Sequence, residues 1–162
     1  MSYHVTPVPY GTFSSTSSQY VSDVASSQAV TYDTTAIAKG ISLASGSRIT
    51  LPQIGNYALS FSAIGNNKGT ASPKWVNLFL KKNGNLVDNS STIVVVTKQV
   101  PNTIVATFDI ECTTVGDYYE IFMAGESTDC GILATAAQAA VPLTSPAMPA
   151  CPSIVTVVWQ IS

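Results

Sequence analysis

The sequence predicts an all-β fold, an antiparallel two-sheet sandwich or jelly roll of about eight to ten strands with an extended N-terminal arm. Three observations support this prediction. Apolar and polar residues alternate along most of the chain, and the 3.6-residue period of a helix is almost absent. Gly, Pro and Asn separate the alternating segments, as expected for turns between strands. The 162 residues are enough for one domain around one hydrophobic core.

The clearest strands have one apolar and one polar face, as half-buried antiparallel strands do. In residues 57–63 and 104–112 the large apolar face includes Phe61 and Phe108, which we expect to find in the core. Residues 76–81 lead into Asn83-Gly84, a dipeptide that tolerates the positive φ angles of a type I′ hairpin turn. The remaining expected strands are 86–87, 93–97, 118–126 and 154–161, with shorter ones at 28–32, 40–44 and 48–51.

The last expected strand places four large apolar side chains on one face. They are Val155, Val157, Trp159 and Ile161. Because it closes the chain, we expect it to be a central strand.

Two segments interrupt this pattern. Residues 1–27 are rich in Ser, Thr and Tyr without sustained alternation, which predicts an extended arm ahead of a jelly-roll domain at 28–162. Residues 134–152 contain four prolines and the run Ala-Ala-Gln-Ala-Ala, which predicts a long rigid loop before the last strand. Loops of this length are often functional.

Charge is scarce in this chain and excludes several functions. Only 10% of the residues are charged, against about 25% in an average domain. A surface with so little charge suggests that a partner covers much of it. The net charge of -2 gives no basic stripe for nucleic acid, and no membrane anchor or secretory signal is evident. We therefore expect a soluble chain made in the cytoplasm that binds neither nucleic acid nor membrane.

Catalysis has little support in the sequence. The single histidine, His4, lies in the expected arm, so a nucleophile would lack an ordered base. Asp109 and Glu111 share one strand face and could serve glycoside hydrolysis or bind calcium, but a solvated outer face explains them more simply. We expect no enzyme, no cofactor and no metal.

The cysteines also suggest no site. Cys112, Cys130 and Cys151 are odd in number and lack the spacing of zinc ligands. We interpret them as small buried hydrophobic residues that stay reduced.

A series of short motifs in this chain resembles a known group of jelly rolls. The motifs are Gly40-Ile41-Ser42-Leu43, Ser47-Arg48-Ile49-Thr50-Leu51-Pro52, Gly55-Asn56-Tyr57, Phe61-Ser62-Ala63, Leu80-Lys81-Lys82-Asn83-Gly84, Gly116-Asp117-Tyr118 and Pro152-Ser153-Ile154 through Ile161. In this order and spacing they resemble the tumour-necrosis-factor and complement globular-head type of jelly roll. Tyr10-Gly11-Thr12-Phe13 and Tyr32-Asp33-Thr34-Thr35 resemble the version in small structural proteins of phages and giant algal viruses. The resemblance covers nearly the whole chain.

The resemblance implies a homotrimer that forms through one face of the sandwich. Outward-facing aromatic and aliphatic side chains would supply the contacts, since a monomer would leave them wet. The residues expected at this interface are Trp75, Phe79, Val105, Tyr118 and Phe122. Several of them could instead cap the ends of the core, and a twofold arrangement stays open.

The resemblance also implies a place on the surface of a virion. We expect a capsid decoration or cement protein whose partner is the major capsid protein or another virion protein. The arm would attach to the particle through aromatic anchors at Tyr3, Tyr10, Phe13 and Tyr20. The alternative is a tail-fibre or receptor-binding head that recognises a host-surface glycan or protein, but the chain has no repeat to build a shaft. A secreted cytokine-like or adhesin ligand ranks third because no signal segment is evident.

Overall fold

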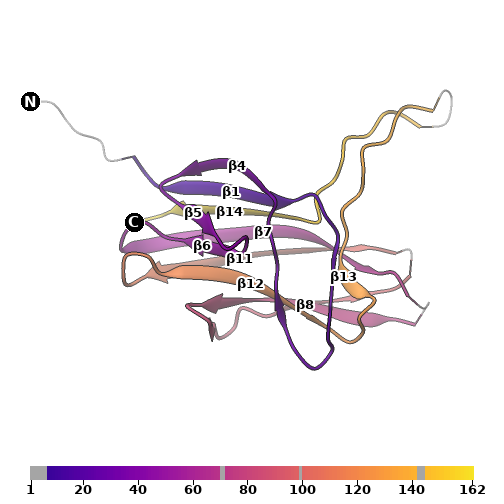
Figure 1. Cartoon of the computed structure of the whole chain (residues 1–162), viewed down its shortest axis with the longest axis horizontal. Coiled ribbons are helices and arrows are strands. Elements are labelled where there is room, and N and C mark those ends of the chain that lie inside the picture. Colours follow the sequence, from indigo (N-terminus) through magenta and orange to yellow (C-terminus); the bar gives the residue numbers. More distant parts are fainter. Residues whose placement is uncertain (1–6, 70–71, 99, 142–144) are drawn as a thin grey trace, which may run out of the picture.

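Two antiparallel sheets form a sandwich in the computed structural model, which describes residues 7–69, 72–98, 100–141 and 145–162 (Figure 1). Within these ranges all regular elements are strands. The described residues contain no helix that could cross a membrane. Sheet I comprises β1 (Tyr10–Ser15), β2 (Gln19–Tyr20), β4 (Thr34–Lys39), β7 (Gly55–Asn67), β11 (Asn102–Cys112), β13 (Cys130–Ile132) and β14 (Ile154–Gln160). Sheet II comprises β3 (Gln28–Ala29), β5 (Ser42–Ala44), β6 (Arg48–Thr50), β8 (Lys74–Lys82), β9 (Asn85–Leu86), β10 (Thr92–Val96) and β12 (Tyr118–Gly125).

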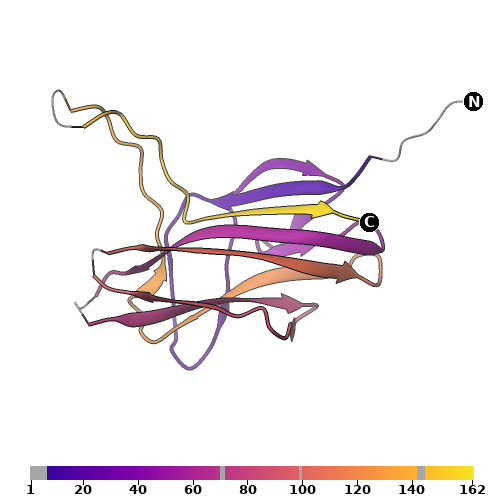
Figure 2. The same ribbon diagram turned by 180° about the vertical axis from the view of Figure 1, so that it is seen from behind.

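The strand order places β14 inside sheet I, as expected for the closing strand. The longest strand, β7, pairs with β11 on one side and with β14 on the other. β14 then pairs with β1, and β1 pairs with β4 at the far edge. In sheet II the order is β10-β8-β12-β6-β5. Figures 1 and 2 show β4, β1, β14, β7 and β11 following one another across the molecule.

The core lies between the sheets and consists of the apolar faces that the alternation predicts. Phe61 is 1% exposed and pairs with Phe108 at a ring distance of 6.2 Å. Phe108 is only half-buried, because it lies on the edge strand β11. The other inward residues of β7, β8 and β12 are fully or almost fully buried; they are Tyr57, Leu59, Ala63, Val76, Leu78, Leu80, Tyr119, Ile121 and Met123. Removing these side chains from water provides the main driving force for folding.

The hairpin between β8 and β9 has the predicted turn. Asn83 and Gly84 have φ angles of 50° and 84°, the left-handed conformation that a type I′ turn requires at both positions. The other expected strands are also present, with small shifts at their ends. The number of strands is larger than expected because β1, β2, β4 and β13 gave no clear alternation in the sequence.

The expected arm at 1–27 is wrong for its described part. Tyr10–Ser15 form β1, which pairs with β4 and with β14 in the middle of sheet I. Phe13 is 0% exposed and contacts the ring of Tyr32 at 6.2 Å. The sequence shows no apolar alternation here because the other inward residues of β1, Gly11 and Ser15, are too small to mark an apolar face. The jelly-roll domain therefore begins well before residue 28.

The segment before β14, expected to be a long rigid loop, forms a long hairpin. It leaves the sandwich between β13 and β14 and projects beyond the end of the sheets (Figures 1 and 2). Its two limbs are joined by the isolated bridges Thr135–Cys151, Gln138–Met148 and Val141–Ser145. We call residues 134–152, apart from 142–144, the projecting hairpin.

Candidate functional site

Three long strands inside sheet I carry no charged residue. Neither β1, β7 nor β14 contains Lys, Arg, Asp or Glu. Their inward side chains fill the core. Their outward side chains, together with Val105 and Thr107 of the neighbouring strand β11, form one continuous surface that we call the uncharged face. A strand face without charge is uncommon on a solvated surface, where Lys, Glu, Asp and Arg are usually found.

The pairing of strands defines the rows of the uncharged face. Val105 of β11 and Val155 of β14 both lie opposite Ser62 of β7. The next row consists of Thr107, Ser60 and Val157. Small residues in the middle of each row leave the face flat.

Two aromatic side chains end the uncharged face at the side of the termini. Trp159 lies opposite Ala58 and is 39% exposed. Tyr10 lies beside Trp159 on the next strand, β1, and is 38% exposed. The two strands are held together here by the Gln160 N–H, which donates to the Pro9 carbonyl at 3.0 Å. Large apolar area is thus left open to water at this end.

Among the described strands of sheet I, charged residues occur only on β11 and β4, which lie at opposite edges. Asp109 and Glu111 are exposed on the edge strand β11, and Lys39 is exposed on the opposite edge strand β4. An apolar centre with a polar rim is the usual arrangement of a protein–protein interface.

The outer face of sheet II is different, because charged groups cover its aromatic residues. Lys81 Nζ lies 3.9 Å from the ring centre of Phe122, and the Arg48 guanidinium lies 4.8 Å from that of Tyr118. Glu120 accepts a hydrogen bond from Ser47 at 2.6 Å. Covering this face with another protein would require Lys81 and Arg48 to lose their water, which is costly.

Asp117 fixes the turns at one end of sheet II. Its carboxylate accepts hydrogen bonds from the Asn83 side chain at 2.8 Å and from the Thr113 and Thr114 backbone N–H groups at 2.9 and 3.1 Å. Lys82 Nζ lies 3.0 Å away. The hydrogen bond from Asn83 is the main reason why the pKa of Asp117 is well below its usual range. The carboxylate therefore has a structural role in joining two turns.

Comparison with known proteins identifies the fold. No family model and no curated protein matches the sequence. The crystal structure of murine APRIL at pH 5.0 matches with a TM-score of 0.58 at 8% identity, over 96% of this chain and 100% of that chain. The globular domain of the zebrafish complement 1qA protein matches with a TM-score of 0.56 at 15% identity, over 96% and 98% of the two chains. The fold is a jelly roll of this type. The fold predicted from the sequence motifs is confirmed.

The jelly roll divides the expected interface residues between its two faces. Trp75, Phe79, Tyr118 and Phe122 all point outward from sheet II, and the rings of Phe79 and Phe122 lie 6.1 Å apart. Val105 lies on the opposite side of the sandwich, on the outer surface of sheet I, and is 60% exposed. The sequence did not single out Trp159 and Val157 for the interface, although their alternation marked one shared face.

The expected attachment residues are also separated. Tyr3 lies outside the described residues, as does His4. Phe13 is a core residue, so its assignment as an anchor for another protein is wrong. Tyr20 is half-buried, with Lys68 Nζ 4.1 Å from its ring centre and its hydroxyl accepting a hydrogen bond from Asn66 at 3.1 Å. Tyr10 is exposed, at the end of the uncharged face.

The described residues offer no catalytic arrangement. No group of three or more His, Cys, Asp or Glu side chains within the described ranges is placed to hold a metal ion. Burial raises the pKa of the Cys112 and Cys130 thiols, which makes both poor nucleophiles. Their burial agrees with their interpretation as small core residues, whereas Cys151 is half-buried at the base of the projecting hairpin.

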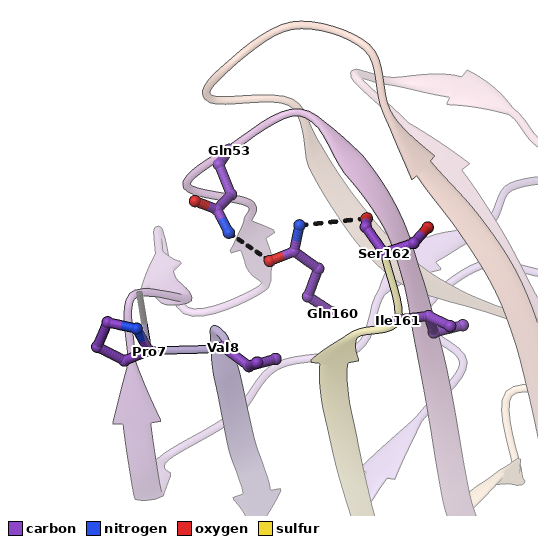
Figure 3. Close-up of a pocket in the computed structure, with 6 residues that line it drawn as sticks. All are labelled: Pro7, Val8, Gln53, Gln160, Ile161 and Ser162. Atoms are coloured by element: carbon purple, nitrogen blue, oxygen red, sulfur yellow. Dashed lines mark hydrogen bonds between the residues drawn. The ribbon is translucent and has the colours of Figure 1, made fainter. Parts of the chain in front are cut away.

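A small pocket lies beside the terminal segments (Figure 3). Its volume is about 240 Å³, and it is lined by Pro7, Val8, Gln53, Gln160, Ile161 and Ser162. The Gln53 amide donates to the Gln160 side chain, which donates in turn to the Ser162 carbonyl at 3.2 Å. These amides bond to one another and include neither a base nor a nucleophile. The pocket therefore has no evident chemistry.

Proposed function

We propose that this jelly roll is a non-enzymatic structural protein that assembles into a homotrimer through its uncharged face. We further propose that the trimer decorates the surface of a virus particle. The observation that carries the assembly is the absence of charge from the inner strands β1, β7 and β14, whose outward residues would otherwise stay in contact with water.

The energetics favour the uncharged face over the outer face of sheet II. Burying Val105, Val157 and Trp159 removes apolar surface from water, and the nearest charged residues of this sheet, Asp109 and Lys39, lie on its edge strands β11 and β4, where they can stay in contact with solvent. On sheet II the same step would desolvate Lys81 and Arg48. The jelly-roll fold and the resemblance on which the trimer was predicted support threefold closure.

The place on a virion rests on the resemblance to small structural proteins of phages and giant algal viruses. A compact oligomer with one adhesive surface is sufficient for a decoration protein, and the capsid protein is the partner we propose. The residues before β1, including Tyr3, remain the proposed attachment segment. Mass spectrometry of purified particles tests this place: several hundred copies per particle support decoration, and only a handful indicate a tail.

Two tryptophans provide a matched pair of variants for the assembly surface. Trp159 on sheet I and Trp75 on sheet II are 39% and 38% exposed, so replacing either with Lys changes a similar area. Trp159→Lys should convert the trimer into monomers in mass photometry at micromolar concentration, because the charge would be buried at the interface. Trp75→Lys should remain a trimer.

The opposite result would move the interface to sheet II. If Trp75→Lys and Phe122→Lys dissociate while Trp159→Lys assembles normally, the residues selected from the sequence form the contact. A wild-type chain that is monomeric, with a mass near 17.0 kDa, would contradict the assembly itself. Thermal melting of each variant shows whether loss of assembly comes from loss of folding.

The second candidate function, glycan recognition by a receptor-binding head, is favoured by one pocket on sheet II. Its volume is about 330 Å³, and it is lined by Phe79 and Leu86 together with polar residues that include Asn77, Asp88 and Asn89. An aromatic side chain beside carboxylate and amide groups is suited to the apolar and hydroxyl sides of a sugar. A glycan array separates the two functions: binding that Phe79→Ala and Asp88→Ala both abolish would favour the receptor-binding head.

A further inference from the structure

The projecting hairpin repeats every three residues, unlike the strands of the sandwich. Its paired positions are 135, 138 and 141 on one limb and 151, 148 and 145 on the other. Each pair exchanges two backbone hydrogen bonds, with N···O distances of 2.9 to 3.1 Å. A three-residue period is that of an extended polyproline-type chain, whereas a regular strand has a period of two.

The amino-acid sequence has the same period. On the first limb the paired residues are separated by Ala-Ala at 136–137 and 139–140. On the second limb they are separated by Pro-Ala at 146–147 and 149–150. The residues between the paired positions are therefore small, and most are exposed. Val141 and Met148, at paired positions, are also exposed, by 55% and 44%.

This hairpin cannot hold its form well by itself. An isolated two-stranded hairpin is marginal in water, and the large side chains of this one, Val141 and Met148, are exposed rather than buried between its limbs. The N–H groups of Ala136, Ala137, Ala139 and Ala140 make no hydrogen bond within the described chain. Its flat sides and free N–H groups are suited to a second extended chain that can approach closely.

We infer that the projecting hairpins of neighbouring copies pack along one another and extend the trimer beyond its sandwiches. This inference rests on the proposed self-assembly through the uncharged face. A partner that packs against the hairpin must present small residues with the same three-residue period. A second copy of the hairpin has this pattern because its sequence is identical. Small residues at every contact allow close approach of extended chains, as Gly does in a triple helix.

The position of the hairpin agrees with this partner. It grows out of β13 and β14, two strands of the sheet that carries the uncharged face. Residues 130–162 contain no Lys, Arg, Asp or Glu, so the uncharged surface continues from β14 into both limbs. At its base, the Ala134 N–H donates to Ser18 Oγ at 2.9 Å and fixes the hairpin to sheet I. Closed symmetry would bring all hairpins of one oligomer to the same end.

Disulfide cross-linking of the full chain tests the contact directly. Ala139→Cys places a thiol on an exposed flat side of the hairpin, and Ala44→Cys places one on an exposed alanine of sheet II as the matched control. Both variants carry Cys151→Ser, so that the half-buried native thiol does not compete. Packed hairpins present their thiols at an effective concentration in the millimolar range, so mild oxidation of micromolar protein should link Ala139→Cys about a hundredfold faster than Ala44→Cys.

The outcomes separate this inference from the proposed function. If the chain is a trimer by mass photometry, Trp159→Lys dissociates it, and Ala139→Cys links no faster than Ala44→Cys, the hairpins do not meet and the inference is overturned alone. If the wild-type chain is monomeric, the assembly fails at that first measurement. Links from Ala139→Cys that form only to another polypeptide on purified particles would also overturn it and assign the hairpin to the capsid.

Discussion

Replacing Asp117 with Ala should lower the free energy of unfolding by about 3 kcal/mol at neutral pH. The structure gives the reason: the carboxylate is 6% exposed and is the common acceptor for Asn83, Thr113 and Thr114. Each hydrogen bond to a charged group contributes roughly 1.5 to 3 kcal/mol, and bonds to one carboxylate do not add independently. Lys82 keeps a second acceptor, the Glu111 carbonyl at 2.8 Å, which limits the loss.

The same change should remove a pH-dependent part of the stability. Because the pKa of Asp117 is lowered in the folded state, its contribution is complete above the unfolded pKa of about 3.9 and is lost as the pH falls toward the folded pKa. The difference between wild type and Asp117→Ala should therefore be largest at neutral pH. It should shrink steadily below about pH 4.

Chemical denaturation at a series of pH values measures both effects. Asp88→Ala is the control, since Asp88 is exposed outside the turn network, and it should change stability by less than about 0.5 kcal/mol. A loss below about 1 kcal/mol for Asp117→Ala would mean that the turns hold without the carboxylate. A difference from wild type that stays constant down to pH 2 would contradict the lowered pKa.

Three further comparisons between variants test which residues form the core. Phe61→Ala should cost about 3 to 5 kcal/mol and Phe108→Ala about half as much, because only Phe61 is fully buried; equal losses in urea unfolding would contradict this difference. Phe13→Ala should lower the free energy of unfolding as much as Phe61→Ala, whereas Tyr10→Ala should change monomer stability by less than about 1 kcal/mol. The opposite result would mean that residues 10–15 form an extended arm and not a core strand. Burial raises the pKa of Tyr32, so the free energy of unfolding should fall above about pH 10 in the wild type and fall less in Tyr32→Phe. Circular dichroism at a series of pH values follows this loss. An equal fall with pH in both proteins would contradict the raised pKa.

Alternation in the sequence was sufficient to predict the strands that bury large residues. Phe61 and Leu78 have large neighbours two positions away, so their faces are visible without a structure. β1 was missed because Phe13 is its single large inward residue, and β4 because all of its residues are exposed. Such strands are held by pairing with their neighbours, which a local pattern does not contain.

The candidate site was harder to predict because outward residues obey no local rule. Phe79 and Phe122 looked unsuited to water, but Lys81 covers the Phe122 ring from a neighbouring strand, a contact that depends on pairing across sheet II. The buried face of β14 was also ambiguous. Thr156 is 0% exposed, and its hydroxyl bonds to the buried Tyr32 hydroxyl at 2.8 Å, a partner distant in the sequence.

The composition of β14 argues that its outer face is covered in the working protein. Antiparallel strands with one wet face show apolar residues at every second position, whereas strands covered on both faces form nearly continuous apolar runs. β14 reads Ile-Val-Thr-Val-Val-Trp, apolar on both faces, although the single chain buries only Ile154, Thr156 and Val158. The sequence of β14 is therefore typical of a strand that is buried on both faces. We propose that a second copy of the chain, packed against the uncharged face, buries the outer face of β14.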